Sequence, residues 1–297
     1  MNAAEARRCI ITSTAPIENA SLDQWYVIDA GCDITPVTKS YRLLSCDLEA
    51  RRDADGTVIV TRTADRTALP VRERYGFIWT TLGAPSGNPV DIPEAGETDR
   101  QRVPCGPIGV RASGLRVVEN FLDMAHFPFV HTDILGAEPH TEVRPYKVET
   151  RREVDEVWAT QCEFYQPQAA MSAMGGIMTQ YMYRVASPFV TLLYKTCPLA
   201  PNRWDVICLF VQPVEPAESR AHLVMFIIDE VTPIADLVRF QQLIFLQDRI
   251  ILENQRPRLL PLDPRQEIPT RADIMSVAYR RWLKAKGVSF GTAERAA

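Results

Sequence analysis

Four long runs of alternating polar and apolar residues constrain the fold of this 297-residue chain more than any other feature. They occupy residues 141–164, 180–196, 204–214 and 222–231. A period of two places the apolar side chains on one face of a strand, so the runs predict an antiparallel sheet with one buried face. The segment 233–255 changes to an apolar period of three to four, which predicts a long helix.

This order of elements predicts an α+β helix-grip (START-like) fold, in which the long C-terminal helix lies across a curved antiparallel sheet. Such an arrangement encloses an elongated pocket for a small, flat or mostly apolar ligand. A final helix over 272–286 should end at Gly287. We expect the apolar residues of the long helix to be buried: Leu237, Phe240, Leu243, Ile244, Leu246, Ile250 and Ile251.

The first hundred residues are expected to form a separate β-rich domain. The sequence 53–56 (DADG) is a hairpin-turn signal. Residues 84–106 are rich in Pro, Gly and acidic residues, which indicates a boundary region. We therefore predict two domains, 1–100 and 101–297, the second opening with a strand near 108–113. The strand candidates of the first domain are 24–29, 39–44, 58–62 and 75–82.

Composition excludes several classes of protein. The net charge is −4 and no basic run occurs, which argues against nucleic-acid binding. No apolar run approaches the roughly 20 residues of a membrane-spanning helix, and the first residues lack a secretory apolar segment. The seven cysteines are scattered, with no CxxC or CxH pair, so we expect free thiols and a cytoplasmic protein.

The segment 119–131 (ENFLDMAHFPFVH) has the composition of one wall of a metal site. It holds Asn120, Asp123, His126 and His131, including two of the chain's four histidines. Two histidines and one carboxylate on one face of an iron ion are typical of oxygen-activating mononuclear sites. On an unbroken helix, a spacing of five would separate the histidines by about 140°. We expect a helix over 120–125 that Pro128 disturbs or ends, so that both imidazoles converge.

The third ligand must come from elsewhere, and the long helix offers Asp248 and Glu253. A carboxylate on a largely apolar helix is costly unless it is paired or bound to a metal. Alternatively, Asp248 is a surface residue paired with Arg249 or Lys284.

The other polar residues have simpler interpretations. Asn120 alone is also compatible with a helix cap. His140 and His222 show no partner pattern and are expected to be ordinary surface or core histidines.

Three segments together resemble one enzyme family. The pattern Asn120-x-x-Asp123-x-x-His126-x-x-x-x-His131 with a following Gly136, the segment 245–257 and the ending 278–283 (AYRRWL) are similar to Rieske non-heme iron oxygenases. The resemblance spans roughly residues 100 to 290. It is strongest to the branch that contains vanillate and dicamba O-demethylases, ketosteroid hydroxylases and methylxanthine N-demethylases.

The resemblance implies a role for each residue of the motif. His126, His131 and Asp248 would bind a mononuclear Fe(II). Asp123 would be hydrogen-bonded to an iron-ligand histidine and would reach toward the electron-donating cluster. Asn120 would lie close to the iron. A carboxylate in the position of Asp123 fixes the tautomer and orientation of an imidazole ligand.

The chain departs from the family in its N-terminal part. The family's [2Fe–2S] cluster needs two Cys and two His in a CxH and a CxxH pattern. The first 125 residues contain no histidine, and Cys9, Cys32 and Cys46 lack the spacing. The flanks 23–27 and 69–80 are nevertheless similar to the start and end of a Rieske domain. We therefore predict a truncated Rieske-like β domain with no [2Fe–2S] cluster in this chain.

An oxygenase without a cluster must receive its electrons from another protein. The resemblance implies a Rieske-containing reductase that docks near Asp123, a layout similar to that of methylxanthine N7-demethylase catalytic subunits. It also implies a homo- or hetero-oligomer based on a trimer.

The reaction expected from the resemblance is oxidative removal of an N- or O-methyl group from a small aromatic substrate, with consumption of O₂. A methylxanthine is one such substrate. Two alternatives stay open: a non-catalytic partner subunit of a hetero-oligomeric oxygenase, and a helix-grip binding module without redox chemistry. The retained ligand set argues against the first. Candidate pocket residues are Phe164, Met171, Met174, Met178, Tyr181, Phe240 and Leu243.

Overall fold

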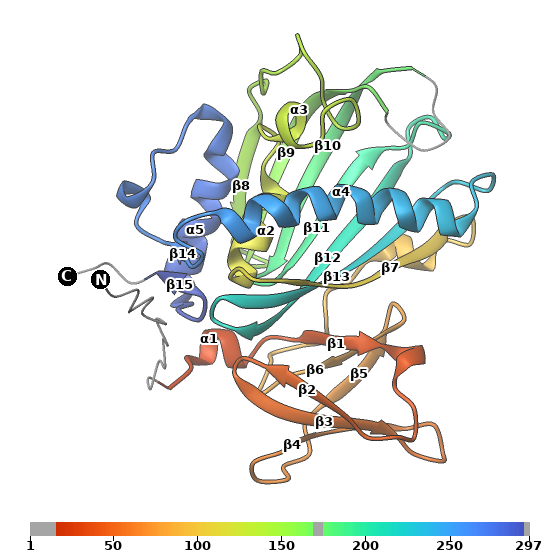
Figure 1. The fold of residues 1–297 in the computed structure, drawn as a ribbon, viewed down its shortest axis with the longest axis vertical. Helices are drawn as coiled ribbons and strands as arrows, with labels where there is room; N and C mark the ends of the chain where they lie inside the picture. The colour runs from red at the N-terminus through yellow and green to blue at the C-terminus, as the bar shows by residue number, and fades with distance from the viewer. Residues whose placement is uncertain (1–15, 169–174, 294–297) are drawn as a thin grey trace, which may run out of the picture.

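A seven-stranded antiparallel sheet dominates the computed structural model, which describes residues 16–168 and 175–293 (Figure 1). The sheet order is β7-β13-β12-β11-β10-β9-β8, and every neighbouring pair is antiparallel. The predicted alternating runs supply six of these strands. The strands are β7 Gln101–Val110, β8 Lys147–Arg151, β9 Glu156–Gln166, β10 Ile177–Ser187, β11 Val190–Thr196, β12 Trp204–Glu215 and β13 Glu218–Ile227.

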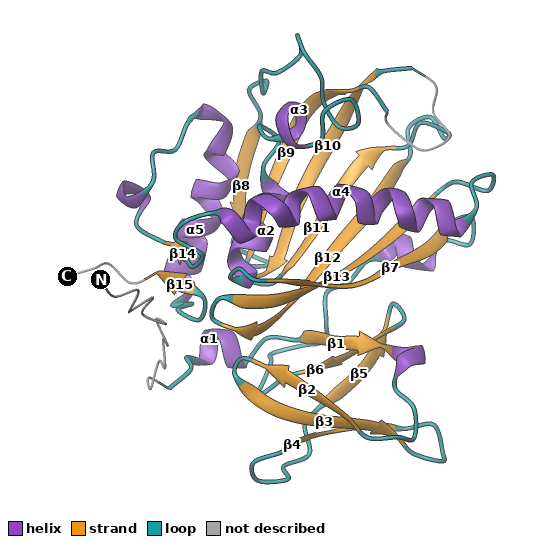
Figure 2. Ribbon diagram, viewed as in Figure 1, coloured by secondary structure: helices purple, strands orange, loops and turns teal. Residues whose placement is uncertain are grey.

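The predicted long helix is α4, Ile234–Asn254, which crosses one face of this sheet (Figures 1 and 2). Helix α2, Gly114–Leu122, packs between α4 and the sheet end, and α5, Ile274–Lys286, packs on β8 and β9. Gly287 ends α5 in the left-handed conformation, with φ of 76°. The predicted helix-grip architecture is confirmed.

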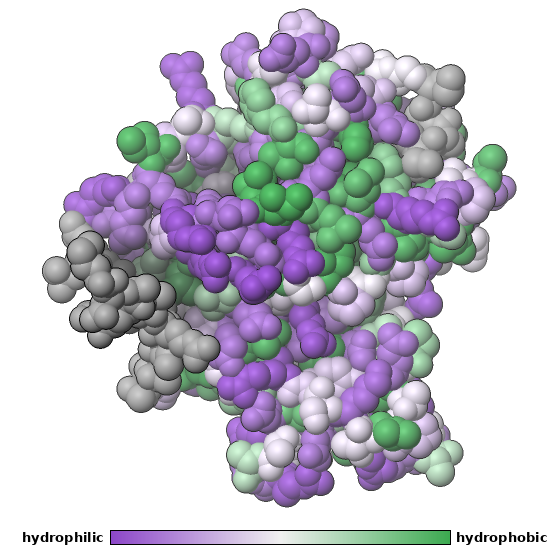
Figure 3. All heavy atoms as spheres, in the orientation of Figure 1, coloured by the Kyte–Doolittle hydropathy of each residue, from purple (hydrophilic) through white to green (hydrophobic). Residues whose placement is uncertain are grey.

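The burial predicted for α4 is only half right. Leu237 and Ile244 face the core, and the apolar residues off this stripe are exposed, because a helix laid on one sheet buries a single stripe. Ile251 lies on the same stripe, seven residues after Ile244, but is exposed near the C-terminal end of the helix. Figure 3 shows hydrophobic side chains gathered over this helix. The exposed set is Leu243, Leu246, Ile250 and Ile251.

The first six strands form two three-stranded sheets, ordered β1-β6-β5 and β2-β3-β4. The expected turn at 53–56 joins β3 to β4, and Gly56 has a φ of 87°. The sequence did not predict β3 or β5, because their exposed faces carry Arg and Glu in place of apolar residues. The bounds are β1 Tyr26–Ala30, β2 Lys39–Leu43, β3 Cys46–Arg52, β4 Val58–Arg62, β5 Val71–Arg74 and β6 Phe77–Thr80.

The expected strand near 108–113 begins earlier than predicted. Strand β7 starts at Gln101 and includes Pro104 and Pro107, which suggested a loop in the sequence. It lies at the sheet edge and pairs with β13 alone, and an edge strand tolerates proline because the N–H groups on its outer side have no strand partner.

The remaining elements are short. They are α1 Asn19–Leu22, α3 Phe127–Val130, β14 Leu260–Pro261, β15 Thr292–Ala293 and 3₁₀ turns at Gly31–Asp33, Pro93–Gly96, Pro264–Gln266 and Arg271–Asp273. In the part of the chain that the structure describes, no helix combines the length and apolarity needed to cross a membrane.

Candidate metal centre

The motif segment breaks between two helices. Helix α2 ends at Leu122, and Asp123 adopts an extended backbone with ψ of 137°, so the expected helix over 120–125 is wrong in its last residues. The Asp123 carboxylate accepts hydrogen bonds from the N–H groups of Ala125 (3.0 Å) and His126 (3.1 Å). A short carboxylate can compete with the helix for local N–H groups in this way.

Pro128 was expected to disturb or end this helix, but it occupies the first turn of the new helix α3. A proline is tolerated there because its missing N–H would have had no partner inside the helix. The break between α2 and α3 turns the chain, and it allows His126 and His131 to face the same point.

Three ligand atoms meet at that point. The Nε2 atoms of His126 and His131 are 3.2 Å apart, and they lie 3.2 and 3.0 Å from Oδ1 of Asp248 on α4. Ligand atoms about 2.1 Å from a metal and at right angles to each other are separated by about 3.0 Å. The spacing therefore fits one face of an octahedral metal site.

The opposite nitrogen of each imidazole faces an acceptor. Nδ1 of His126 lies 2.7 Å from Oδ2 of Asp123, and Nδ1 of His131 lies 2.8 Å from Oε1 of Gln247. These partners assign the proton of each neutral imidazole to Nδ1, which leaves both Nε2 lone pairs directed at the Asp248 carboxylate. Three acceptors pointing at one another are unfavourable unless a metal ion, or a proton held on one of the imidazoles, lies between them. The donor set is that of the two-histidine, one-carboxylate iron sites.

The charges around the triad favour a cation as well. Burial lowers the pKa of His126, but hydrogen bonds to Asp123 and Asp248 outweigh burial and raise that pKa to about 9. Burial raises the pKa of Asp248, but the two histidines outweigh it and hold the carboxylate pKa below its usual value. The pocket thus stabilises positive charge at the point where the three ligand atoms converge.

The alternatives for Asn120 and Asp248 are not observed. Ser113 caps α2, whereas the Asn120 amide donates to Oδ1 of Asp248 at 3.4 Å. Glu253 does not reach the triad; it accepts hydrogen bonds from the Arg249 side chain and the Arg111 N–H. The five-residue spacing on α4 turns Glu253 about 140° away from Asp248.

The other two histidines behave as expected for ordinary residues. His140 is exposed, and its ring lies 4.4 Å from that of Tyr165. His222 is buried, and its Nε2 lies 3.0 Å from Oε1 of Gln212. Burial lowers the pKa of His222 to about 4, so this histidine is neutral at physiological pH.

Gln247 was not predicted as a site residue. The available signal was its position next to Asp248 on an apolar helix, since Gln247 contacts His131, which Asp248 also contacts. His131 is only 1% exposed, so water has little access to the Nδ1 group that Gln247 satisfies.

A cavity of about 110 Å³ lies beside the triad, between the sheet and α4. Of the residues proposed for it, Tyr181 and Phe240 are in the lining. The others are not: Phe164 packs in the core against Phe127, and Met178 and Leu243 are exposed. Met171 and Met174 lie outside the described residues. The apolar lining between the ends of the cavity includes Leu193, Ile207, Leu223, Met225, Ile244 and Phe245.

A second cleft, of about 500 Å³, opens on the other side of His126. Its floor includes Asn120 and Asp123, and its rim includes Ile251 of α4 and Ile268. Ile268 is 95% exposed and Ile251 is 49% exposed, so the cleft carries apolar side chains that are open to solvent. His126 therefore separates an inner cavity from an outer cleft.

A buried ion network supports the helix that carries Asn120. Arg116, 1% exposed, donates to Glu119 (2.9 Å) and to both carboxylate oxygens of Glu267. Arg280 of α5 pairs with the same two acids. The network ties α2 to α5 and to the loop at the cleft rim.

Comparison with known proteins identifies close relatives. Residues 110–287 match the model of the vanillate O-demethylase oxygenase C-terminal domain. The chain is 47% identical over 272 residues to a probable methylxanthine N7-demethylase, NdmC, of Pseudomonas sp. (strain TJI-51), covering 91% of this chain and 96% of that protein. It is 27% identical to the methylxanthine N1-demethylase NdmA of Pseudomonas putida over 71% of this chain and 58% of that protein.

The fold is also shared with solved structures. That of Pseudomonas putida CBB5 NdmA with caffeine superposes with a TM-score of 0.73, at 17% identity, covering 90% of this chain and 91% of that one. Dicamba monooxygenase bound to 3,6-dichlorosalicylic acid gives a TM-score of 0.69, at 15% identity, covering 90% and 97%. These matches place the arrangement of sheet and long helix in a known architecture.

Proposed function

The chain belongs to the Rieske-type oxygenases that share the vanillate O-demethylase C-terminal domain, and on that premise we propose that it removes the N7-methyl group of a methylxanthine. The 47% identity to a probable methylxanthine N7-demethylase supports this choice of substrate. The reaction would consume the methylxanthine, O₂, two electrons and two protons, and release the N–H product, formaldehyde and water. A C–H bond is oxidised and O₂ is reduced.

His126, His131 and Asp248 would hold one Fe(II), and the observation that carries this proposal is the convergence of their three acceptor atoms within 3.2 Å. Bound iron of this type supplies the activation of O₂ for hydroxylation of a methyl C–H bond. Asp123 and Gln247 hold the two imidazoles in the required tautomer and orientation. Asn120 restrains the carboxylate of Asp248 through its amide.

The inner cavity would hold the substrate. Its apolar middle suits the faces of a flat ring and leaves little room for bulk water. Phe127 forms one wall near the triad, with its ring 5.0 Å from that of His126 and 6.3 Å from that of Tyr181. These rings would fix the plane in which the methyl group is presented to the metal site.

We assign residues 1–100 to a shortened Rieske-like β domain without a cluster, and residues 101–297 to the catalytic domain. The absence of histidine before residue 126 supports the first assignment, because the cluster needs two. Electrons would then come from a separate Rieske-containing reductase. The outer cleft supports a docking place for it, since Asp123 joins the cleft floor to His126 by a hydrogen bond of 2.7 Å.

Reconstitution tests this function. The iron-loaded chain, 7-methylxanthine, NADH and a Rieske-containing reductase should yield formaldehyde and xanthine in equal amounts. The matched variant Asp248→Asn should yield neither, whereas Asp236→Asn, which removes the same charge from the first turn of α4, should behave as the natural chain does. Turnover by the iron-free chain or by Asp248→Asn at the natural rate would refute the proposal.

A further inference from the structure

The inner cavity has a second polar end, away from the three candidate iron ligands. Lys195 of β11 and Asp205 of β12 both line the cavity. They are directly paired across the two strands, and Tyr181 of β10 is paired with Lys195 on the other side. Paired residues of antiparallel strands point to the same face of the sheet, so these three side chains form one row beneath α4.

The row extends away from the triad. Neighbouring strands are about 4.8 Å apart, so Asp205 lies two strand spacings, about 10 Å, from Tyr181. The Tyr181 ring is 6.3 Å from that of Phe127, which in turn is 5.0 Å from that of His126. A flat bicyclic ring with its methyl group at the triad would therefore direct its opposite edge toward Lys195 and Asp205.

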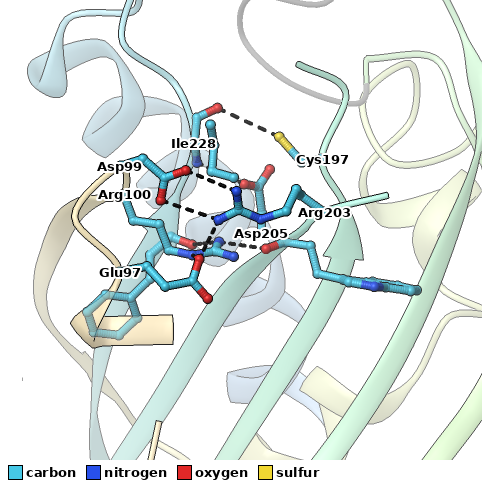
Figure 4. Close-up of polar contacts among 9 residues, drawn as sticks. Glu97, Asp99, Arg100, Cys197, Arg203, Asp205 and Ile228 are labelled. Atoms are coloured by element: carbon cyan, nitrogen blue, oxygen red, sulfur yellow. Dashed lines mark hydrogen bonds and ion pairs between the residues drawn. The ribbon is translucent and has the colours of Figure 1, made fainter. Parts of the chain in front are cut away.

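Polar contacts position Asp205 and the strand ends beside it (Figure 4). Its carboxylate accepts a hydrogen bond from the Ile228 N–H at 3.0 Å. Arg100 donates to the main-chain oxygens of Trp204 (2.6 Å) and Phe226 (3.2 Å), which clamps the strand ends on either side. Arg203, two residues before Asp205, forms ion pairs with Glu97 and Asp99. A polar group fixed in this way discriminates between ligands, because it cannot move to relieve a mismatch.

The two charged groups are also desolvated. Burial raises the pKa of Asp205, and burial lowers that of Lys195; in each case the attraction of the partner charge opposes the effect of burial. A ligand that leaves a desolvated donor or acceptor unsatisfied is rejected strongly. Asp229 also lines this end, but its carboxylate caps the following loop by accepting from Val231 and Thr232.

We propose that Lys195 and Asp205 determine substrate specificity by reading the ring edge opposite the methyl group, with Lys195 donating to a ring carbonyl and Asp205 accepting from a ring N–H. This inference rests on the proposed function and narrows it. The preferred substrate is an N7-methylxanthine whose six-membered ring keeps an N–H beside a carbonyl. A fully methylated xanthine has the carbonyls but no N–H, so it can accept from Lys195 but offers no donor to the desolvated Asp205 carboxylate, which keeps only its contacts within the protein.

Two variants separate the two contacts. Asp205→Asn keeps an acceptor for the Ile228 N–H but turns an N–H donor toward the cavity. This variant should raise the dissociation constant of 7-methylxanthine by about 10- to 100-fold and change that of caffeine by less than about threefold. Lys195→Met removes the donor to the ring carbonyl. Because both ligands carry that carbonyl, the variant should raise both dissociation constants by similar factors. The measurement is the dissociation constant of each ligand from the iron-loaded chain, by anaerobic titration calorimetry.

The control is Asp236→Asn, which makes the same charge change outside the cavity and should alter neither constant. If Asp205→Asn fails to fold, as judged by circular dichroism, the natural protein decides the Asp205 contact: it should bind 7-methylxanthine at least about tenfold more tightly than caffeine, and equal dissociation constants would overturn that contact. Two results would overturn this inference but not the proposed function, provided that the natural protein binds 7-methylxanthine. One is an Asp205→Asn variant with the same ratio of the two dissociation constants as the natural protein. The other is a Lys195→Met variant in which neither dissociation constant changes. Natural protein that binds neither ligand would overturn the proposed function itself.

Discussion

Replacement of Gln247 by Met should weaken iron binding without touching any iron ligand. Gln247 accepts the hydrogen bond of the His131 Nδ1 group at 2.8 Å, and His131 is 1% exposed. Methionine is similarly long and unbranched but lacks the amide oxygen. Because water has little access to the imidazole, the variant leaves a buried N–H unsatisfied, which costs about 1–3 kcal/mol.

This cost lowers the affinity for Fe(II), because the His131 imidazole can turn toward another partner in the metal-free protein but not when it is bound to the metal. We expect iron affinity to fall by about 10- to 100-fold. The assay is competition for Fe(II) with a chelator of known affinity under anaerobic conditions.

Gln242→Met is the matched control. Gln242 lies on the same helix and donates to the main-chain oxygen of Cys105 at 2.9 Å, so this variant makes the same substitution and also loses one side-chain amide hydrogen bond, but away from the imidazoles. Its iron affinity should equal that of the natural chain. Equal affinities in Gln247→Met and Gln242→Met would refute the role assigned to Gln247 and to the His131 tautomer.

Three further changes test other parts of the account. Asp123→Asn should keep iron while reductase-driven demethylation slows at least about tenfold; a loss of iron in proportion to activity would contradict this separation. Arg116→Met should lower the free energy of unfolding by about 1.5–3 kcal/mol, because it removes the charged hydrogen bonds of Arg116 and leaves Glu119 and Glu267 with Arg280 as their shared cation; urea denaturation measures the loss, and a value near zero would show that the network is not stabilising. Burial raises the pKa of Glu18, but hydrogen bonds from Ser21, Ser289 and Phe290 outweigh it and lower that pKa below 4.5. Its stabilisation is therefore present above about pH 4.5 and lost as pH falls through the lowered pKa. Glu18→Gln should reduce the urea midpoint at pH 7 and match the natural chain in acid, and a constant difference at all pH values would contradict this linkage.

The fold was largely predictable because its strands alternate over long runs and α4 has a clear helical period. The failures have physical causes. Strand β7 contains Pro104 and Pro107, which an edge strand tolerates and a local pattern does not reveal. The outer stripe of α4 is as apolar as its inner stripe, so periodicity alone does not tell a covered surface from an exposed one.

The candidate site shows the same division. The residue types and spacing of His126 and His131 pointed to a metal, and α4 offered Asp248. The convergence of the three ligand atoms depends on the backbone break at Asp123, where the carboxylate competes with the helix for N–H groups. The prediction extended this helix to residue 125, whereas it ends at Leu122. Gln247, Lys195 and Asp205 were not selected, because their roles depend on which strand or helix face meets the triad or cavity.

The iron and acid-labile sulfide content of the purified chain distinguishes a mononuclear iron site from a [2Fe–2S] cluster. If His126, His131 and Asp248 hold one iron and the N-terminal β domain holds no cluster, the chain should contain about one iron and no labile sulfide, and Asp248→Ala should lose the iron. About three irons with two sulfides per chain, or iron retained in full by Asp248→Ala, would contradict this assignment.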